Sequence, residues 1–304
     1  MMTAGPPVAP APAPPDIDAL AAVFGLDPGG AEVVRAATRH VVRFPASDVR
    51  TFAVRGGTTG PRQEAAIAAL LADAGVPATR RLAGPTRIDD WMVTAWREIP
   101  GVDPDSPPVD AAVLGTLAAR LHRATGGLDR RGVVACDPLG AALSQLEVAI
   151  PAGSTSDDEL GILRRAATRL EPVWQAAVDA AVRDGGAVLH GDLHAGNVVI
   201  GRQGPVLVDL ELAGWGPPAY DAAPTVAFVR WYDSPARAND AFDEAYGAPL
   251  TAAARVGSLD EVWALWSTCW CVANRHRSAE LEEEAKVRLA TVDTGEAPSP
   301  WQLR

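Results

Sequence analysis

Apolar residues in the first hundred positions follow two periods, one helical and one typical of strands. Asp16–Phe24 (DIDALAAVF) combines an aspartate cap with helical apolar spacing, which predicts a short leading helix. Two valine-rich runs come next, AEVVRAATRHVVRF and VRTFAVRGG, and the PASD turn between them predicts a β-hairpin. A second helix is predicted over Arg62–Ala74, because Gly75 and Pro77 follow it in the usual order for a helix end. ATRRLAGP and DDWMVTAWREIPG predict two more strands, the second ending near Trp96, so this part is a small, mostly antiparallel α+β unit.

The pattern after Gly101 is mainly helical. The turn-rich stretch DPDSPP separates it from the first part. Val109–Ala124 predicts one helix, and Asp157–Asp184 predicts one or two. The period then changes to that of strands in AVLH, NVVI and PVLVDLE, with the turn GRQG between the last two. Helical spacing resumes at Pro224 and continues to about Leu289, so the second part is larger, helical and interrupted by one β-hairpin.

These elements divide the chain into three predicted parts. Residues 1–15 form a Pro/Ala tail that we expect to be disordered, residues 16–97 the small sheet lobe, and residues 98–304 the helical lobe. The tail lacks the basic and apolar regions of a signal peptide, and no apolar run reaches the roughly 18 residues of a membrane helix. The three cysteines lack the even spacing of a disulfide framework and read as buried small apolar residues. We therefore expect a cytoplasmic protein without a membrane partner.

The charge balance limits the classes of partner. The chain has 27 Lys and Arg against 38 Asp and Glu, a net charge of -11. A nucleic-acid partner would require a basic stripe, so this class is excluded. An acidic surface is compatible with a cationic small molecule, although it also serves solubility alone.

Polar residues concentrate in one stretch of the second part, HGDLHAGNVV, directly before an apolar strand. Asn197 begins the predicted hairpin and Asp209 ends it, so the turn at GRQG could bring the two side chains together. Amide and carboxylate oxygens are ligands that suit Mg²⁺. Asp192, on the loop before Asn197, could then accept the proton of an attacking hydroxyl. This division of roles is that of phosphoryl transfer.

The same residues resemble a known family. His190-Gly191-Asp192-Leu193-His194-Ala195-Gly196-Asn197, followed by Asp209-Leu210-Glu211, is similar to the motifs of the aminoglycoside phosphotransferase and choline kinase group, relatives of protein kinases. The resemblance continues in LAARLHRAT, AGWGPPAYDAA and RQEAAIAALLADAGVPA, in the family's order. It implies an α+β, two-lobed, protein-kinase-like fold with a small antiparallel-sheet N-lobe and a larger, mainly helical C-lobe. It also implies ATP and Mg²⁺ as cofactors.

The nucleotide site departs from the family pattern. The family's strand lysine would fall in TFAVRGG, which offers Arg55, and its helix glutamate would be Glu64. Arginine keeps the charge but differs from lysine in size and shape. The expected phosphate loop, Ala36–His40, contains no glycine, so Thr38 and backbone N–H groups would have to serve. The segment linking the lobes, which includes Arg97 and Ile99, would offer backbone contacts to the adenine ring.

The remaining polar residues of the motifs have less specific expectations. His190 is expected to position the loop, and His194 either packs in the loop or contacts phosphate or substrate. Glu211 is expected near the metal, with a contact to the substrate as the alternative. Asp221 is expected to be structural, tying the loop to a helix N-terminus.

Acidic and aromatic residues after Pro224 are candidates for binding the acceptor. The candidates are Trp231, Tyr232, Asp233, Asp240 and Trp270. Trp263, Trp266 and Trp270 share one helical face, a pattern more typical of a core than of a cleft. If part of that stripe lines a cleft, the rings and carboxylates suit an amine-bearing ligand.

Two functions therefore fit the sequence. The first is an ATP- and Mg²⁺-dependent kinase for a hydroxyl of a small molecule, such as an aminoglycoside or other antibiotic, an amino sugar or an amino alcohol. The second is a pseudokinase-like binding protein, which the missing strand lysine and the glycine-free loop favour. Asp192, Asn197 and Asp209 are all present, and this set favours the enzyme.

Overall fold

The computed structural model describes residues 13–36, 39–55, 59–103, 105–128, 133–149 and 155–302. The chain divides into two compact units. The first contains Met1–Ala69 and Thr79–Pro100, and the second contains Leu70–Ala78 and Gly101–Arg304. The short segment 70–78 therefore groups with the second unit, although residues on both sides of it belong to the first.

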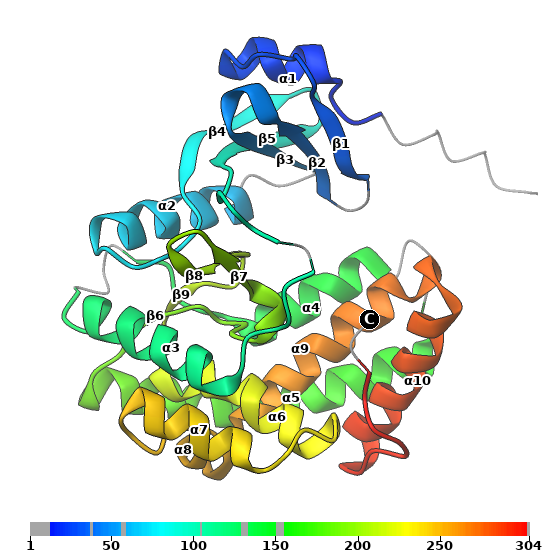
Figure 1. Cartoon of the computed structure of the whole chain (residues 1–304). Helices are drawn as coiled ribbons and strands as arrows, with labels where there is room; N and C mark the ends of the chain where they lie inside the picture. The colour runs from blue at the N-terminus through cyan, green and yellow to red at the C-terminus, as the bar shows by residue number, and fades with distance from the viewer. Residues whose placement is uncertain are drawn as a thin grey trace, which may run out of the picture. The chain divides into compact units, whose positions relative to one another are not determined.

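The first unit is built on one antiparallel sheet with the strand order β1-β2-β3-β5-β4 (Figure 1). Its strands are β1 (Glu32–Ala36), β2 (Arg39–Phe44), β3 (Val49–Arg55), β4 (Arg81–Ile88) and β5 (Trp91–Arg97). The predicted valine-rich hairpin was wrong in one respect, because its first run forms two strands, β1 and β2, and only the second run forms β3. The valine-rich pattern of AEVVRAATRHVVRF gave no sign of the break between β1 and β2, and residues 37–38 lie outside the described part.

Two helices accompany this sheet. The predicted leading helix is confirmed as α1 (Ile17–Phe24), with the Asp16 carboxylate accepting a hydrogen bond from the Ala19 N–H at 2.7 Å. Leu20 of α1 packs with inward-facing strand residues such as Val42 and Val93, which forms the core of the unit. The second predicted helix, α2 (Thr59–Asp73), begins three residues earlier than expected, and its end is followed by Gly75 in the left-handed region.

The second unit is mainly helical. Its helices before the hairpin are α3 (Ala111–Thr125), α4 (Pro138–Ala149) and α5 (Asp157–Asp184). Those after it are α6 (Ala223–Trp231), α7 (Arg237–Tyr246), α8 (Leu250–Val256), α9 (Leu259–Asn274) and α10 (Ala279–Thr294). The predicted 157–184 segment is one continuous helix despite its internal Pro172. Among the described residues, no helix combines the length and apolar character required to span a bilayer.

Two small antiparallel pairs lie within the helices (Figure 1). The predicted hairpin is present as β7 (Val198–Gly201) and β8 (Gly204–Leu207), with Val198 opposite Leu207. The predicted strand AVLH is β6 (Ala187–Leu189), and it pairs with β9 (Gly214–Gly216). The loop from β6 to β7 and the loop from β8 to β9 are therefore held next to each other at both ends.

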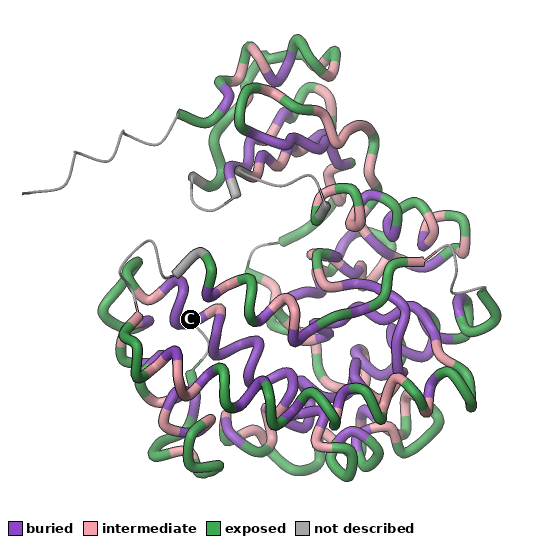
Figure 2. Tube along the Cα trace, turned by 180° about the vertical axis from the view of Figure 1, so that it is seen from behind, coloured by how far each residue is buried: buried purple, intermediate pink, exposed green. Residues whose placement is uncertain are grey.

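Helix α9 is the most deeply buried helix of this unit. In its sixteen residues only Glu261 and Trp270 lack full burial, and Figure 2 shows buried residues through the middle of the unit and exposed ones along its outer turns. The three cysteines, as predicted, are unpaired and buried, two of them on α9. Side chains on α9 are therefore closely surrounded by the rest of the unit.

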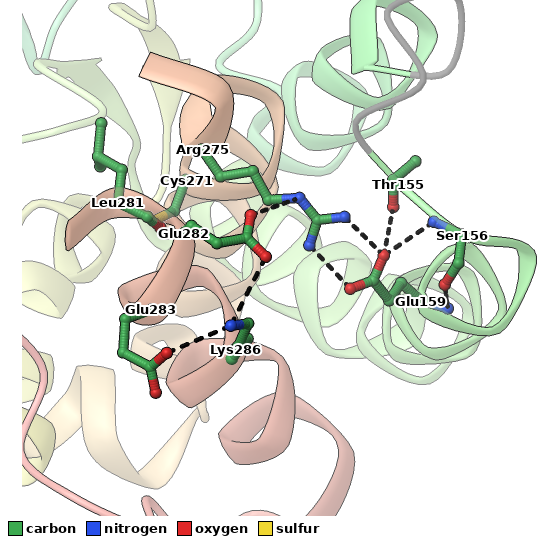
Figure 3. Close-up of polar contacts among 9 residues, drawn as sticks. All are labelled: Thr155, Ser156, Glu159, Cys271, Arg275, Leu281, Glu282, Glu283 and Lys286. Carbon is green, nitrogen blue, oxygen red and sulfur yellow. Dashed lines mark hydrogen bonds and ion pairs between the residues drawn. The ribbon is translucent and has the colours of Figure 1, made fainter. Parts of the chain in front are cut away.

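An ion-pair group connects α5 with the start of α10 (Figure 3). The Arg275 guanidinium donates to both oxygens of Glu159 at 2.8 Å, and its Nε lies 3.4 Å from Glu282. Glu159 also accepts from the Ser156 N–H in a capping box. The hydrogen bonds from Arg275 outweigh the effect of burial and hold the pKa of Glu159 at about 2, below its ordinary 4.5.

Replacing Glu159 with Gln is expected to lower the free energy of unfolding by about 1–2 kcal/mol near neutral pH, since it breaks a bidentate pair. The pKa of Glu159 is lowered on folding, so its contribution is present above pH 4.5 and is lost as the pH falls toward 2. The difference in free energy of unfolding between the wild type and Glu159→Gln should therefore become smaller at low pH. Urea denaturation at a series of pH values measures it. The control is Glu283→Gln, whose partner Lys286 and own side chain are exposed, with an expected effect below about 0.5 kcal/mol. Equal losses in the two variants would contradict the prediction.

Candidate catalytic site

The polar stretch 190–197 forms the loop between β6 and β7. It leaves β6 at His190, turns at Gly191 and enters β7 after the short helical turn Ala195–Asn197. Gly191 has φ +81, and a Cβ there would clash with the Leu212 carbonyl oxygen of the β8–β9 loop. Only glycine fits this close approach of the two loops.

A fully buried carboxylate anchors the start of the loop. Asp221 accepts hydrogen bonds from the backbone N–H groups of His190 and Gly191, both at 2.9 Å, one on each oxygen. His122 of α3 adds a third contact, with its Nε2 at 2.9 Å from Asp221 and its Nδ1 at 3.1 Å from the Tyr246 hydroxyl. The expectation that Asp221 is structural fits this geometry, but its partners are loop backbone groups instead of a helix N-terminus.

The side chain of His190 holds the two loops together. Its Nδ1 accepts from the Asp192 N–H at 3.3 Å, so Nε2 carries the proton and donates to the Val208 carbonyl oxygen at 2.9 Å. The Val208 N–H in turn donates to the Asn197 carbonyl oxygen at 3.0 Å. Both ring nitrogens of this fully buried histidine are therefore used in positioning the loop.

The Asp192 carboxylate is held from two directions. Its Oδ1 accepts from the indole N–H of Trp263 at 2.7 Å, and its Oδ2 accepts from the Asn197 amide at 3.0 Å. The same amide nitrogen donates to the Asp192 backbone carbonyl at 2.9 Å. Asp192 is 8% exposed, so the carboxylate is buried but still has an accessible edge.

His194 lies beside the same carboxylate oxygen as Asn197, with its Nε2 3.2 Å from the Asn197 amide nitrogen. Its Nδ1 accepts from the Gly196 N–H at 3.0 Å, and its Nε2 is 3.5 Å from Asp192 Oδ2. The imidazole ring also contacts the rings of Phe228 and Trp263, with centroids 6.1 Å and 6.5 Å away. His194 thus packs within the loop and against α6 and α9 while one edge faces the carboxylate.

These contacts shift the pKa values of both groups. Burial acts to raise the pKa of Asp192, but the charge of His194 and hydrogen bonds from His194 and Trp263 outweigh it and lower that pKa. Burial acts to lower the pKa of His194, but the charges of Asp192 and Asp209 outweigh it and raise that pKa. The carboxylate is therefore ionised at neutral pH and can accept a proton.

The residues expected to bind metal supply hard oxygen ligands. The contacts of Asn197 use its amide nitrogen, so the amide oxygen is the atom that it could offer to a cation. Asp209 follows β8 with φ 60, and its charge acts on His194. Among the described residues, no three His, Cys, Asp or Glu side chains are grouped as a metal site. The donor set fits Mg²⁺ only when phosphate or water oxygens complete its coordination.

The predicted nucleotide residues, including Arg97 and Ile99, all belong to the first unit. Arg55 ends β3 with its backbone opposite Trp91, and its side chain lies outside the described part, as does Thr38. Glu64 is half-buried on α2, Arg97 is exposed at the end of β5, and Ile99 is half-buried after it. Their contacts with a nucleotide remain predictions.

The predicted acceptor-binding residues do not form one group, because they differ in burial and in neighbours. Tyr232 stacks on Phe228 at 4.3 Å and lies 6.5 Å from Trp263, so it belongs to the aromatic group beside His194. Trp231 is buried and stacks on Trp301. The other three are Asp233, which is exposed, Asp240, which is exposed on α7, and Trp270, which is half-buried on α9. Glu211, expected near the metal, is exposed after β8.

Two contacts of this site were missed at the level of sequence. Trp263 was placed in a core stripe and is indeed buried, but its N–H reaches Asp192, 71 residues earlier in the chain. His122, within LAARLHRAT, was not assigned a role. A histidine on the same helical face of α3 as Ala118 and Ala119 was the available signal, because a buried imidazole requires polar partners.

Comparisons with known proteins give a family and a fold for this chain. Residues 33–256 match the phosphotransferase enzyme family (APH). Amicoumacin kinase in complex with AMP-PNP and Ca²⁺ is similar in structure, with a TM-score of 0.64, 13% identity and coverage of 91% of this chain and 92% of that one. A microcompartment-associated aminopropanol kinase has a TM-score of 0.65, 17% identity and coverage of 90% and 93%. Choline kinase from Streptococcus pneumoniae has a TM-score of 0.56, 15% identity and coverage of 90% and 98%.

No curated protein sequence matches the chain. The likeness to these solved structures confirms the protein-kinase-like fold predicted from the motifs. The family match spans most of the 304 residues and contains loop 190–197, Asp209 and Asp221. The chain therefore belongs to the phosphotransferase enzyme family.

Proposed function

We propose that this protein is an ATP- and Mg²⁺-dependent kinase that phosphorylates a hydroxyl group of a small molecule. The observation that carries the proposal is the position of the Asp192 carboxylate, held by Trp263 and Asn197 on a loop anchored to Asp221. The family match and the likeness to kinases of amicoumacin, aminopropanol and choline support this class of acceptor. A cytoplasmic location is part of the same proposal.

The proposed roles follow from the positions of the side chains. Asp192 accepts the proton of the attacking hydroxyl while the new phosphorus–oxygen bond forms and the bond to the leaving nucleotide breaks. Asn197 and Asp209 would hold Mg²⁺, which neutralises charge on the phosphates when bound. Arg55 and Glu64 are proposed for the phosphates in place of a lysine–glutamate pair, and Thr38, Arg97 and Ile99 for the rest of the nucleotide.

The acceptor is proposed to be an aminoglycoside or another antibiotic, an amino sugar or an amino alcohol. The aromatic group of Phe228, Tyr232 and Trp263 next to the loop could contact its apolar or cationic part. The guanidinium of Arg288 already lies 5.4 Å from the Tyr232 ring centroid. A positive group on the acceptor would therefore find a more favourable place near Phe228 than at Tyr232, and exposed carboxylates such as Asp233 and Asp240 remain candidates for it.

The test is ADP release by the purified protein with ATP, MgCl₂ and a panel of amines, amino sugars, amino alcohols and antibiotics. Turnover with at least one acceptor, together with a phosphorylated product detected by mass spectrometry, is the expected result. The alternative is a pseudokinase-like binding protein, which Arg55 in the strand and the glycine-free segment 36–40 favour. Binding of nucleotide without turnover across the panel would support that alternative and overturn the kinase.

Replacing Asp209 with Ala is expected to raise the Mg²⁺ concentration for half-maximal activity by about tenfold or more, the effect of losing about 1.5–3 kcal/mol from one charged ligand. Calorimetry should detect Mg²⁺ binding to the wild type only with nucleotide present, because two protein ligands make a weak site. The control is Asp90→Ala, an exposed carboxylate in the turn before β5. Unchanged Mg²⁺ dependence in Asp209→Ala, or tight binding of Mg²⁺ to the protein alone, would contradict the assignment.

A further inference from the structure

We propose that Trp263 is a positioning residue for the reaction, and that its indole N–H fixes the orientation of the Asp192 carboxylate toward the acceptor hydroxyl. This inference rests on the proposed kinase function. It begins from one contact, the hydrogen bond from Trp263 Nε1 to Asp192 Oδ1 at 2.7 Å. Such a distance is within the short range of a hydrogen bond to an ionised acceptor.

The hydrogen bond from Trp263 holds the carboxylate oxygen of Asp192 that the loop residues do not reach. The terminal torsion of an aspartate is broad, so neighbouring donors must set the plane of its carboxylate. Loop residues reach only Oδ2, through Asn197 at 3.0 Å and His194 at 3.5 Å. The Trp263 N–H holds Oδ1 from α9, a separate element, and a plane defined at both oxygens cannot rotate freely.

The indole is itself firmly held. Trp263 is 3% exposed, and its ring lies 5.9 Å from Phe228 and 6.5 Å from both His194 and Tyr232 between centroids. Phe228 and Tyr232, which both contact the indole, also stack on each other at 4.3 Å. An N–H on a ring packed in this way points in one direction, as positioning a reacting group requires.

Trp266, three residues further along α9, provides a matched comparison. It is 7% exposed, and its indole nitrogen has no hydrogen-bond partner among the residues that the structure describes. Both tryptophans are therefore buried on the same helix, and they differ in whether the N–H reaches a carboxylate. A purely structural role predicts similar effects at the two positions, whereas a positioning role predicts an effect on turnover at Trp263 alone.

The experiment compares Trp263→Phe with Trp266→Phe, and adds 3-benzothienylalanine at position 263, which keeps the bicyclic shape and removes the N–H. The assay measures ADP release with ATP, MgCl₂ and whichever panel acceptor the wild type phosphorylates. Both changes at position 263 are expected to lower kcat by about tenfold or more, with KM for ATP within about twofold of wild type. Trp266→Phe is expected to keep kcat within about twofold of wild type. The benzothienyl variant keeps the test decisive if Trp263→Phe folds poorly.

A readout independent of catalysis is the indole ¹H–¹⁵N spectrum of the whole protein. The Trp263 indole signal is expected to move in Asp192→Asn, while the Trp266 signal stays in place. An unmoved Trp263 signal, unchanged kcat in the benzothienyl variant, or equal losses at positions 263 and 266 would each overturn this inference alone. A wild type without turnover for any acceptor would overturn the proposed function and this inference with it.

Discussion

Replacing Asp192 with Asn is expected to lower kcat by about a hundredfold or more, because the acceptor hydroxyl loses its proton acceptor. The side chains have the same size, and the asparagine oxygen can still accept from Trp263. The hydrogen bond from the Asn197 amide to Oδ2 is lost, but the loop is expected to keep its shape through its other contacts. Nucleotide affinity is expected to stay near that of the wild type, since the proposed phosphate ligands are other residues. Steady-state kinetics with a productive acceptor and calorimetry with an ATP analogue measure the two quantities.

The control for this substitution is Asp293→Asn on α10, whose side chain is 49% exposed. It removes the same charge at a distance from the loop and is expected to leave kcat and melting temperature unchanged. Full activity of Asp192→Asn on the same acceptor would remove Asp192 from the role of base. Loss of folding in that variant would show that the carboxylate is mainly structural.

Replacing Asp221 with Ala is expected to destabilise the protein by about 3–5 kcal/mol, the usual effect of removing one partner of a buried charged pair. The substitution leaves the N–H groups of His190 and Gly191 and the Nε2 of His122 without their acceptor in a fully buried place. Activity is expected to fall with stability, because the loop that carries Asp192 loses its anchor. Guanidinium denaturation followed by circular dichroism gives the free energy of unfolding.

Asp179→Ala on α5 is the control, since its carboxylate is exposed and accepts a hydrogen bond from the exposed Gln175. Its expected effect is within about 0.5 kcal/mol of zero. A loss below about 1 kcal/mol in Asp221→Ala would mean that the loop is held mainly by other contacts, such as the bond from His190 to Val208.

Elements with local signals could be predicted from the sequence. Asp16 before α1 and Asp110 before α3 cap their helices through side-chain oxygens, and the β7–β8 hairpin follows from two short apolar runs around a turn. The loop motif likewise indicated where the polar residues would gather. Each of these depends on residues close together in the chain, which sequence patterns report well.

Elements that depend on distant partners could not be predicted. Helix α4 (Pro138–Ala149) has a weak amphipathic pattern and was missed, and it packs against α9. Strand β9, Gly214–Gly216, has two glycines in three residues and becomes a strand by pairing with β6 and, at Trp215, with Ala135. The contact between Trp263 and Asp192 depends on the packing of α9, so periodicity alone indicated a core position.

The grouping of residues 70–78 with the second unit has a consequence for protein synthesis and for the design of fragments. The Pro77 carbonyl accepts from the Leu207 N–H at 2.8 Å, and the Gly75 carbonyl accepts from Arg120. On the ribosome this segment emerges long before Leu207, so its final contacts form only after most of the chain has been made. A fragment ending at residue 100 would carry Leu71 and Val76, both buried in the whole protein, without the rest of their unit. We expect such a truncated chain to aggregate. A fragment designed to fold as the second unit must therefore include residues 70–78.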